Sequence, residues 1–213
     1  MSLLIVWTER DRALLAVDTK GLFLPAPGAA PAATRSVSKL FPFVAAGVVL
    51  ACRGSADYLS MLLSFCNSRN YADFDEFASG LPEALAVVEH AVRSQYRALG
   101  IAGHGDLARV EVCIVGRSAR ASAMRAQMFV RTGSDSGFVP EAAFHEWIQP
   151  WIWADGDCDP PTPSSVAELA RIAHAQVAWC ERESPGQAVV GGSLIVAEMS
   201  SEGCMRISNV CSL

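Results

Sequence analysis

The second residue of this chain has a type and a position that could do chemistry. The 213-residue sequence begins MSLLIVW, so that Ser2 stands directly before an apolar run. A serine hydroxyl is a poor nucleophile until a base takes its proton. If the initiator Met is removed, which a small second residue permits, a free α-amine stands beside this hydroxyl. An α-amine has a pKa of about 8 and can act as that base.

Other kinds of reactive site have little support in the sequence. The four histidines show neither i,i+4 pairing nor H-E-x-x-H spacing, so no metal site is expected. The acidic stretch DGDCD (155–159) lacks the spacing and the downstream Glu of a calcium loop. Gly191 and Gly192 precede a strand-like run rather than a helix and make no anion cradle. We therefore expect neither a metal nor a cofactor.

Composition narrows the classes of partner. The net charge is −5 and no basic run gathers the 17 Lys and Arg residues, which argues against nucleic acid and anionic membranes as partners. The longest apolar stretch, Leu40–Cys52, contains a Pro and is shorter than the roughly 20 residues of a membrane span. The length suits one domain over residues 1–213.

The cysteines predict a reduced protein. Their number, seven, is odd, and no two form a C-x-x-C pair. Cys52, Cys113 and Cys204 lie in apolar, strand-like runs and are interpreted as small core residues. This usage predicts a cytoplasmic location.

Hydrophobic patterning predicts strands in three groups, separated by helices. A hairpin is expected from 3–7 and 13–17, a second from SVSKLFPF (36–43) and AGVVLACRGS (46–55), and two strands near 109–131. One helix is expected from Asp57 and a second over 73–99, where SGLP could interrupt it. A third helix is expected from about Ser165, whose side chain could cap it together with Glu168 three residues later. Two closing strands flank the turn SSEG (200–203).

Four motifs within this order resemble the proteasome β-subunit and HslV family of N-terminal nucleophile hydrolases. They are ALLAVDTKG, SVSKLFPF, VVLACRGSADYLSML, and the run from SVAELARIAHAQ through VVGGSLIVAEM to CMRI. Together they extend from residue 2 to about 210. The resemblance implies an α+β fold, a four-layer α-β-β-α sandwich of two antiparallel sheets flanked by helices, in a subunit that assembles with itself into a ring or another homo-oligomer.

The resemblance also implies a set of roles. Ser2 would be the nucleophile after removal of Met1, and its spacing to Asp18 matches the family. Lys39 stands where the family has its lysine and would lower the hydroxyl pKa, while Asp18 would orient Lys39. The backbone N–H of Arg53 would face the oxyanion. The substrate would be a peptide or another amide.

The sequence also departs from the family pattern. Arg53 replaces the first of two glycines, where a cationic side chain would crowd the substrate or need an acidic partner. Val190 stands before the Gly-Gly turn with no Asp nearby. These departures favour an alternative, a catalytically degenerate relative that serves as an assembly or binding scaffold, and a small-molecule amidase is a further possibility. Asp18 and Lys39 could also be unrelated surface residues.

Two segments allow two interpretations each. TGSDSG (132–137) could supply a supporting Ser134 or form a hairpin turn. The segment 144–161, with Trp147, Trp151 and Trp153, could be an aromatic interface or a loop that covers one edge of the core.

Overall fold

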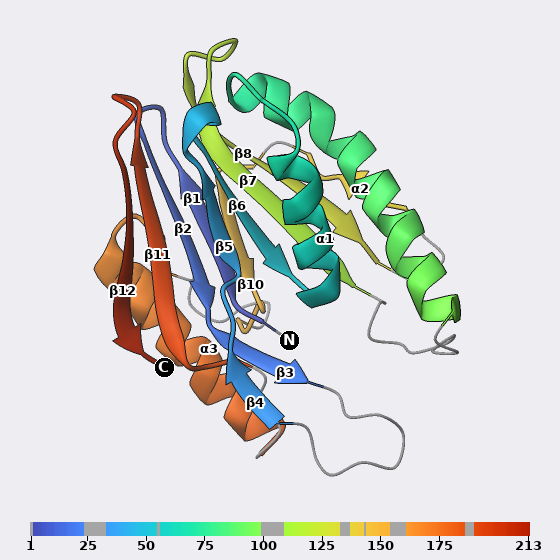
Figure 1. The fold of residues 1–213 in the computed structure, drawn as a ribbon. Coiled ribbons are helices and arrows are strands. Elements are labelled where there is room, and N and C mark those ends of the chain that lie inside the picture. The colour runs from blue at the N-terminus through green and yellow to red at the C-terminus, as the bar shows by residue number, and fades with distance from the viewer. Residues whose placement is uncertain are drawn as a thin grey trace.

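Two large antiparallel sheets dominate the structure (Figure 1). The computed structural model describes residues 2–23, 33–54, 56–98, 109–132, 137–142, 144–153, 161–185 and 190–213. The first sheet has the order β10-β1-β2-β11-β12 and the second has the order β5-β6-β7-β8-β9. A separate hairpin, β3-β4, projects beyond them (Figure 1).

The strands of the first sheet are β1 (Leu4–Thr8), β2 (Arg12–Asp18), β10 (Glu146–Gln149), β11 (Ser193–Ser200) and β12 (Met205–Ser212). Those of the second are β5 (Leu40–Phe43), β6 (Val48–Arg53), β7 (Val110–Ser118), β8 (Ala123–Arg131) and β9 (Val139–Pro140). The hairpin consists of β3 (Lys20–Phe23) and β4 (Ala33–Ser36). The helices are the short 3₁₀ turn η1 (Val44–Ala46), α1 (Ala56–Asn67), α2 (Phe74–Ala98) and α3 (Val166–Glu183).

Three apolar clusters hold these elements together. One joins α1 and α2 to β6 and β7, and includes Leu62, Phe77 and Ile114. A second joins the two sheets through side chains of β1, β2, β6, β7, β8 and β11. A third joins α3 to β1, β2 and β11. Alternate residues of one strand enter different clusters, because successive side chains of a strand point to opposite faces. Figure 1 shows α1 and α2 on one side of the molecule and α3 on the other.

Most expected elements are confirmed. The first hairpin, the closing hairpin and the three helices form where the patterning placed them, and the second hairpin forms over a shorter range, from β5 and β6. Ser165 caps α3, and its side chain accepts a hydrogen bond from the Glu168 N–H at 3.2 Å. SGLP does not interrupt the helix, since α2 continues through Pro82.

The expectation of one strand over 36–43 was wrong. β4 ends at Ser36 and pairs with β3, whereas β5 begins at Leu40 and pairs with β6. The chain therefore changes partner between these strands, and Lys39 lies in the short connection. This change separates Lys39 from a regular ladder and lets its side chain approach the first sheet.

The expectation for Cys204 was wrong, whereas the segment from 144 agrees in part with the interpretation that it covers one edge of the core. Cys204 is exposed at the turn between β11 and β12, not in the core, although Cys52 and Cys113 are buried as expected. The segment from 144 contributes strand β10, which pairs with β1 and covers one edge of the first sheet. Its Trp147 packs against the inter-sheet cluster, whereas Trp151 is half exposed beside Trp153. The DGDCD stretch and residues 133–136 of TGSDSG lie outside the described residues.

Among the described residues, no helix combines the length and the apolar composition that crossing a bilayer requires.

Candidate functional site

Ser2 lies at the start of the first sheet, two residues before β1 begins. It is partly exposed, while Leu3, the next residue, is fully buried. The Ser2 hydroxyl oxygen lies 3.0 Å from Nζ of Lys39, and its carbonyl oxygen lies 2.6 Å from Nε of Arg53. The structure thus brings residues 37 and 51 positions away in sequence to the same serine.

Lys39 has three hydrogen-bond acceptors around its side-chain nitrogen. These are the Ser2 hydroxyl at 3.0 Å, Oδ1 of Asp18 at 2.7 Å and the Lys20 carbonyl oxygen at 2.7 Å. A lysine ammonium has three N–H donors and no acceptor. Three acceptors therefore match the charged form of Lys39, which leaves no lone pair to take a proton from Ser2. In this geometry Lys39 is a source of positive charge and not a base.

Burial opposes the charge on Lys39. The side chain is 8% exposed, and burial lowers the pKa of Lys39 from its ordinary value of 10.5. The charge and hydrogen bond of Asp18 act in the opposite direction, and the charge of Arg53 lowers the pKa further. Lys39 is therefore a cation that loses its proton more readily than an exposed lysine does.

Asp18 ends β2 and is fully buried. Its Oδ1 accepts hydrogen bonds from the Lys39 ammonium and from the Leu3 N–H at 2.8 Å, and its Oδ2 accepts one from the Gly191 N–H at 3.2 Å. A buried carboxylate needs such partners, since an unpaired one costs several kcal/mol. Asp18 therefore ties together Lys39, the strand that begins after Ser2 and the Gly-Gly turn.

Arg53 ends β6 and turns its side chain toward Ser2. Its Nε donates to the Ser2 carbonyl oxygen, and its Nη1 lies 2.9 Å from Oε1 of Glu111. The need for an acidic partner, expected from the sequence, is met by this glutamate. The role of the Arg53 backbone N–H as an oxyanion donor stays a prediction.

Glu111, Arg109 and Thr19 belong to this neighbourhood, and sequence reasoning missed all three. Glu111 is fully buried in β7, and its Oε1 also accepts a hydrogen bond from Nε of Arg109 at 2.7 Å. A signal was present, because a glutamate inside the apolar run ARVEVCIVG needs a cationic partner. The sequence did not show that this partner is Arg53, which faces Glu111 directly across the β6–β7 pair.

Thr19 shapes the Gly-Gly turn. Its hydroxyl accepts a hydrogen bond from the Ser193 N–H at 2.8 Å. Gly192 has a φ of +83°, and a Cβ there would lie 2.6 Å from this hydroxyl, so that only glycine fits. Val190 is buried in the cluster with α3 and presents no polar group to the site.

Cys52 is a second nucleophile type near these residues. It is buried in the cluster beneath α1 and α2, and burial together with the charge of Glu111 raises its pKa to about 12. A thiol must lose its proton to react. The raised pKa and the burial of Cys52 therefore favour the protonated thiol at neutral pH.

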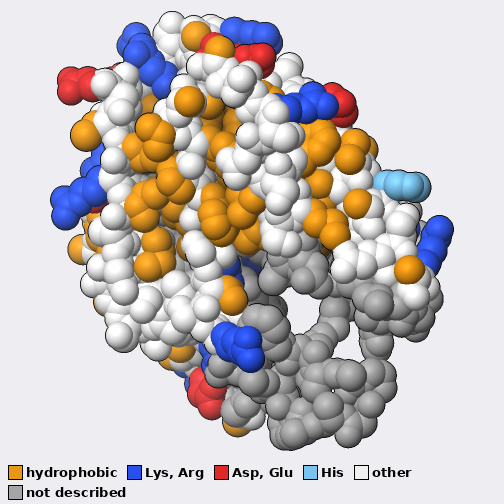
Figure 2. Space-filling model, viewed as in Figure 1, with side chains coloured by type: hydrophobic (Ala, Val, Ile, Leu, Met, Phe, Trp, Pro, Cys, Tyr) orange, Lys and Arg blue, Asp and Glu red, His pale blue; other side chains and the backbone are white. Residues whose placement is uncertain are grey.

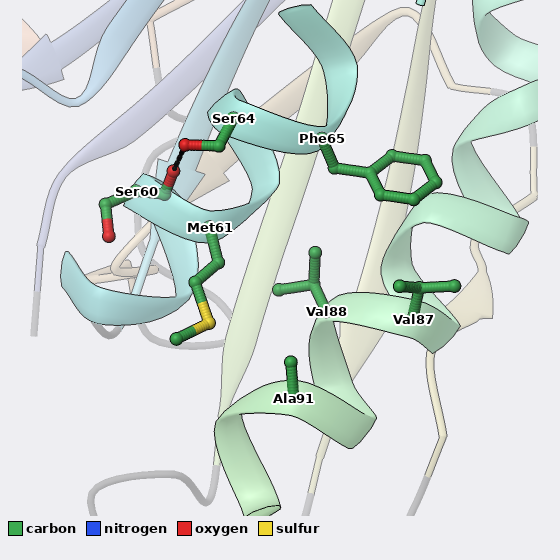
Figure 3. Close-up of a pocket in the computed structure, with 7 residues that line it drawn as sticks. All are labelled: Ser60, Met61, Ser64, Phe65, Val87, Val88 and Ala91. Carbon is green, nitrogen blue, oxygen red and sulfur yellow. Dashed lines mark hydrogen bonds between the residues drawn. The ribbon is translucent and has the colours of Figure 1, made fainter. Parts of the chain in front are cut away.

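A pocket of about 350 Å³ lies elsewhere, between α1 and α2 (Figure 3). Its lining is mostly apolar and includes Met61, Phe65 and Val87, together with Ser60 and Ser64. The Ser64 hydroxyl donates to the Ser60 carbonyl oxygen, so it is a local helix contact rather than an activated nucleophile (Figure 3). None of the four predicted site residues lines this pocket. Among the described residues, no cluster of His, Cys, Asp and Glu is arranged to bind a metal.

Comparisons with known proteins identify solved structures with a similar fold. No family model and no curated sequence matches the chain. Solved structures match the chain. Anbu from Hyphomicrobium sp. strain MC1 is 14% identical with a TM-score of 0.57, and its Gly-1 mutant is 14% identical with a TM-score of 0.58. Each of these two comparisons covers 99% of this chain and 87% of the other. Anbu from Yersinia bercovieri, described as an ancestral β-subunit, is 12% identical with a TM-score of 0.58 over 97% of this chain and 87% of that one. The chain thus has the fold of Anbu, which agrees with the proteasome-like side of the resemblance and does not single out HslV.

Proposed function

We propose that the protein is a proteasome-like N-terminal nucleophile hydrolase that cleaves peptide or amide bonds with Ser2 as its nucleophile. The observation that carries the proposal is the ammonium of Lys39, 3.0 Å from the Ser2 hydroxyl and 2.7 Å from the buried Asp18. An ammonium at this place stabilises the developing alkoxide and so lowers the hydroxyl pKa.

The reaction begins once Met1 has been removed. The neutral α-amine of Ser2 takes the hydroxyl proton while Oγ attacks the carbonyl carbon of the substrate. The same amine, now protonated, gives the proton to the leaving amine as the C–N bond breaks, which leaves an ester on Ser2. Water then attacks this ester with the amine again as base, and the acid product leaves.

The remaining parts of the proposal concern the oxyanion and the assembly. The Arg53 backbone N–H serves as the oxyanion donor. The chain is one domain over residues 1–213 with a four-layer α-β-β-α arrangement, which the three apolar clusters support. It assembles into a homo-oligomer in the cytoplasm. Figure 2 shows hydrophobic side chains gathered over the middle of one face and charged ones mainly toward its edge, which is typical of an interaction surface.

The test is covalent labelling of a chain that carries a cleavable segment before Ser2. Before cleavage the amine is blocked, and a peptide β-lactone should give no adduct by intact mass. After cleavage an adduct should form on Ser2, and the Ser2→Ala variant should give none. A cleaved, folded protein that stays unlabelled would contradict the hydrolase.

A second candidate is a catalytically degenerate scaffold with the same fold. Val190 favours it, because this position carries an apolar side chain where the resemblance implies a supporting carboxylate. The scaffold predicts self-assembly without labelling. Native mass spectrometry measured beside the labelling experiment separates the two, since the hydrolase requires the adduct and both require a mass above the 22.7 kDa monomer.

A further inference from the structure

The Arg53 guanidinium contacts the main chain of the proposed nucleophile as well as an acidic partner. Its Nε donates to the Ser2 carbonyl oxygen at 2.6 Å while Nη1 donates to Glu111 at 2.9 Å. A salt bridge to Glu111 alone would need only one edge of the guanidinium. The planar fork instead bridges the second sheet and the start of the first.

Glu111 fixes where this guanidinium lies. Arg53 and Glu111 are direct cross-strand partners of β6 and β7, and their side chains are 11% and 0% exposed. Arg109 binds the same carboxylate oxygen, whereas Oε2 of Glu111 has no hydrogen-bond partner among the described residues. A buried carboxylate therefore depends on Arg53 and Arg109 for compensation, which restricts Arg53 to few conformations.

Ser2 is consequently held at two of its own atoms and at the next amide. Lys39 binds its hydroxyl, Arg53 binds its carbonyl oxygen, and Asp18 binds the N–H of Leu3. The last two contacts fix the peptide plane that follows Ser2. With the hydroxyl also fixed, the direction of the α-amine from the Ser2 Cα is set.

We propose that Arg53, anchored by Glu111, is a positioning residue that orients the α-amine and the hydroxyl of Ser2 through the Ser2 carbonyl group. The inference rests on the proposed hydrolase function and adds to it a side chain that the family pattern does not place there. It gives the nucleophile a polar support from β6, while Val190 offers none from the Gly-Gly turn. Orientation of this kind is sensitive, because a misplacement of about 1 Å can cost about 100-fold in rate.

The first test measures the contact without any need for activity. In protein labelled with ¹³C′-serine and ¹⁵N-leucine, Ser-Leu peptides give signals, and these are Ser2–Leu3, Ser193–Leu194 and Ser212–Leu213. The Ser2→Ala variant identifies the first. Arg53→Met should move the Ser2 carbonyl shift upfield and leave the other two in place. An unchanged Ser2 shift in folded Arg53→Met would overturn the contact.

The second test measures the consequence by β-lactone labelling after removal of Met1. Arg53→Met should lower the maximal acylation rate about 100-fold with little change in the half-saturating concentration, and Arg53→Lys, which can still donate to the carbonyl, should restore part of it. Glu111→Gln should reduce the rate in the same sense. The matched control is Arg117→Met, since Arg117 donates from Nη1 to the Ser201 carbonyl oxygen at 2.9 Å at the opposite end of the strands.

The outcomes separate this inference from the proposed function. If the wild type is reactive and the Arg53→Met variant keeps the same acylation rate, the positioning role alone is overturned. An unreactive wild type would overturn the hydrolase and with it this role, and the carbonyl shift would then report a purely structural contact. If Arg53→Met does not fold, Arg53→Lys and Glu111→Gln carry the same comparison.

Discussion

The side-chain nitrogen of Lys39 lies 3.0 Å from the hydroxyl oxygen of Ser2 and 2.7 Å from Oδ1 of Asp18. Lys39 and Asp18 are attached to different sheets, because Lys39 precedes β5 of the second sheet and Asp18 ends β2 of the first. The hairpin β3-β4 and the hydrogen bond from the Val37 N–H to the Thr19 carbonyl oxygen return the chain to the end of β2, so that Lys39 lies beside Asp18 where the two sheets meet.

Replacement of Lys39 by Met should lower the rate of Ser2 acylation about 100- to 1,000-fold, because a preorganised donor at the developing charge is lost. The rate is measured by intact mass with a β-lactone. Arg171→Met is the control, since it removes a cation that is 65% exposed on α3. An undiminished rate in Lys39→Met would contradict the role of Lys39.

Should Lys39→Met not fold, the double variant Asp18→Asn/Lys39→Met removes both charges together. It should fold better than either single variant, because each single variant leaves one buried charge without its partner and the double variant leaves none. It should remain unreactive. Restored labelling in the double variant would contradict the proposed role of the ammonium.

The acylation rate should have an alkaline limit below pH 10.5. It rises as the α-amine loses its proton near pH 8 and falls as Lys39 loses its own. Since burial lowers the pKa of Lys39 from 10.5, the charged form disappears at a lower pH than in an exposed lysine. Titration of the Lys39 ¹⁵Nζ signal measures this directly, with Lys39→Met for assignment. A Lys39 signal that titrates at or above pH 10.5 would show that burial does not dominate.

Asp18→Asn should destabilise the fold by about 3–5 kcal/mol, because it leaves the buried Lys39 ammonium without its carboxylate. The partners are 8% and 0% exposed. Urea denaturation followed by circular dichroism measures the change. The matched control is Glu83→Gln, which breaks an exposed pair with Arg69 and should cost far less, because water screens this pair. Equal losses of unfolding free energy in the two variants would contradict the distinction between a buried and an exposed ion pair.

The same Asp18→Asn variant should lower the pKa of Lys39 further. The charge of Asp18 raises that pKa, so its removal leaves burial unopposed by this carboxylate. The alkaline limit of acylation should therefore move to lower pH, and the ¹⁵Nζ titration should move with it. A shift to higher pH would contradict the pairing.

Gly54→Ala should disturb the end of β6 that carries Arg53. Gly54 has a φ of +138°, and a Cβ there would lie 3.1 Å from the Arg109 carbonyl oxygen and from Cγ2 of Val110. Strain of this kind costs about 1–3 kcal/mol, and we expect both a lower urea midpoint and slower acylation. Gly137→Ala is the control, because a Cβ at Gly137 has no neighbour within 4 Å. Equal stability of the two variants would contradict the strain.

Local patterns in the sequence sufficed for much of the fold. Apolar runs bounded by turns placed β1, β2, β11 and β12, and the Ser165 cap placed α3, because these signals depend on neighbours a few residues apart. The hairpin β3-β4 and the edge strand β10 were missed. β10 pairs with β1, which lies far away along the chain, and β3 and β4 are short strands that pair with each other. The residues of these strands show only weak alternation of apolar and polar side chains.

The sequence by itself determined that a serine, an aspartate and a lysine occur at spacings that resemble a family pattern, with an arginine where that pattern has a glycine. Only the tertiary structure decided that Lys39 reaches Ser2 and Asp18 together and that Arg53 binds both Ser2 and Glu111. The physical reason is burial. The packing of two sheets removes these charges from water, and each then requires a partner that only the packed chain can bring within hydrogen-bond distance.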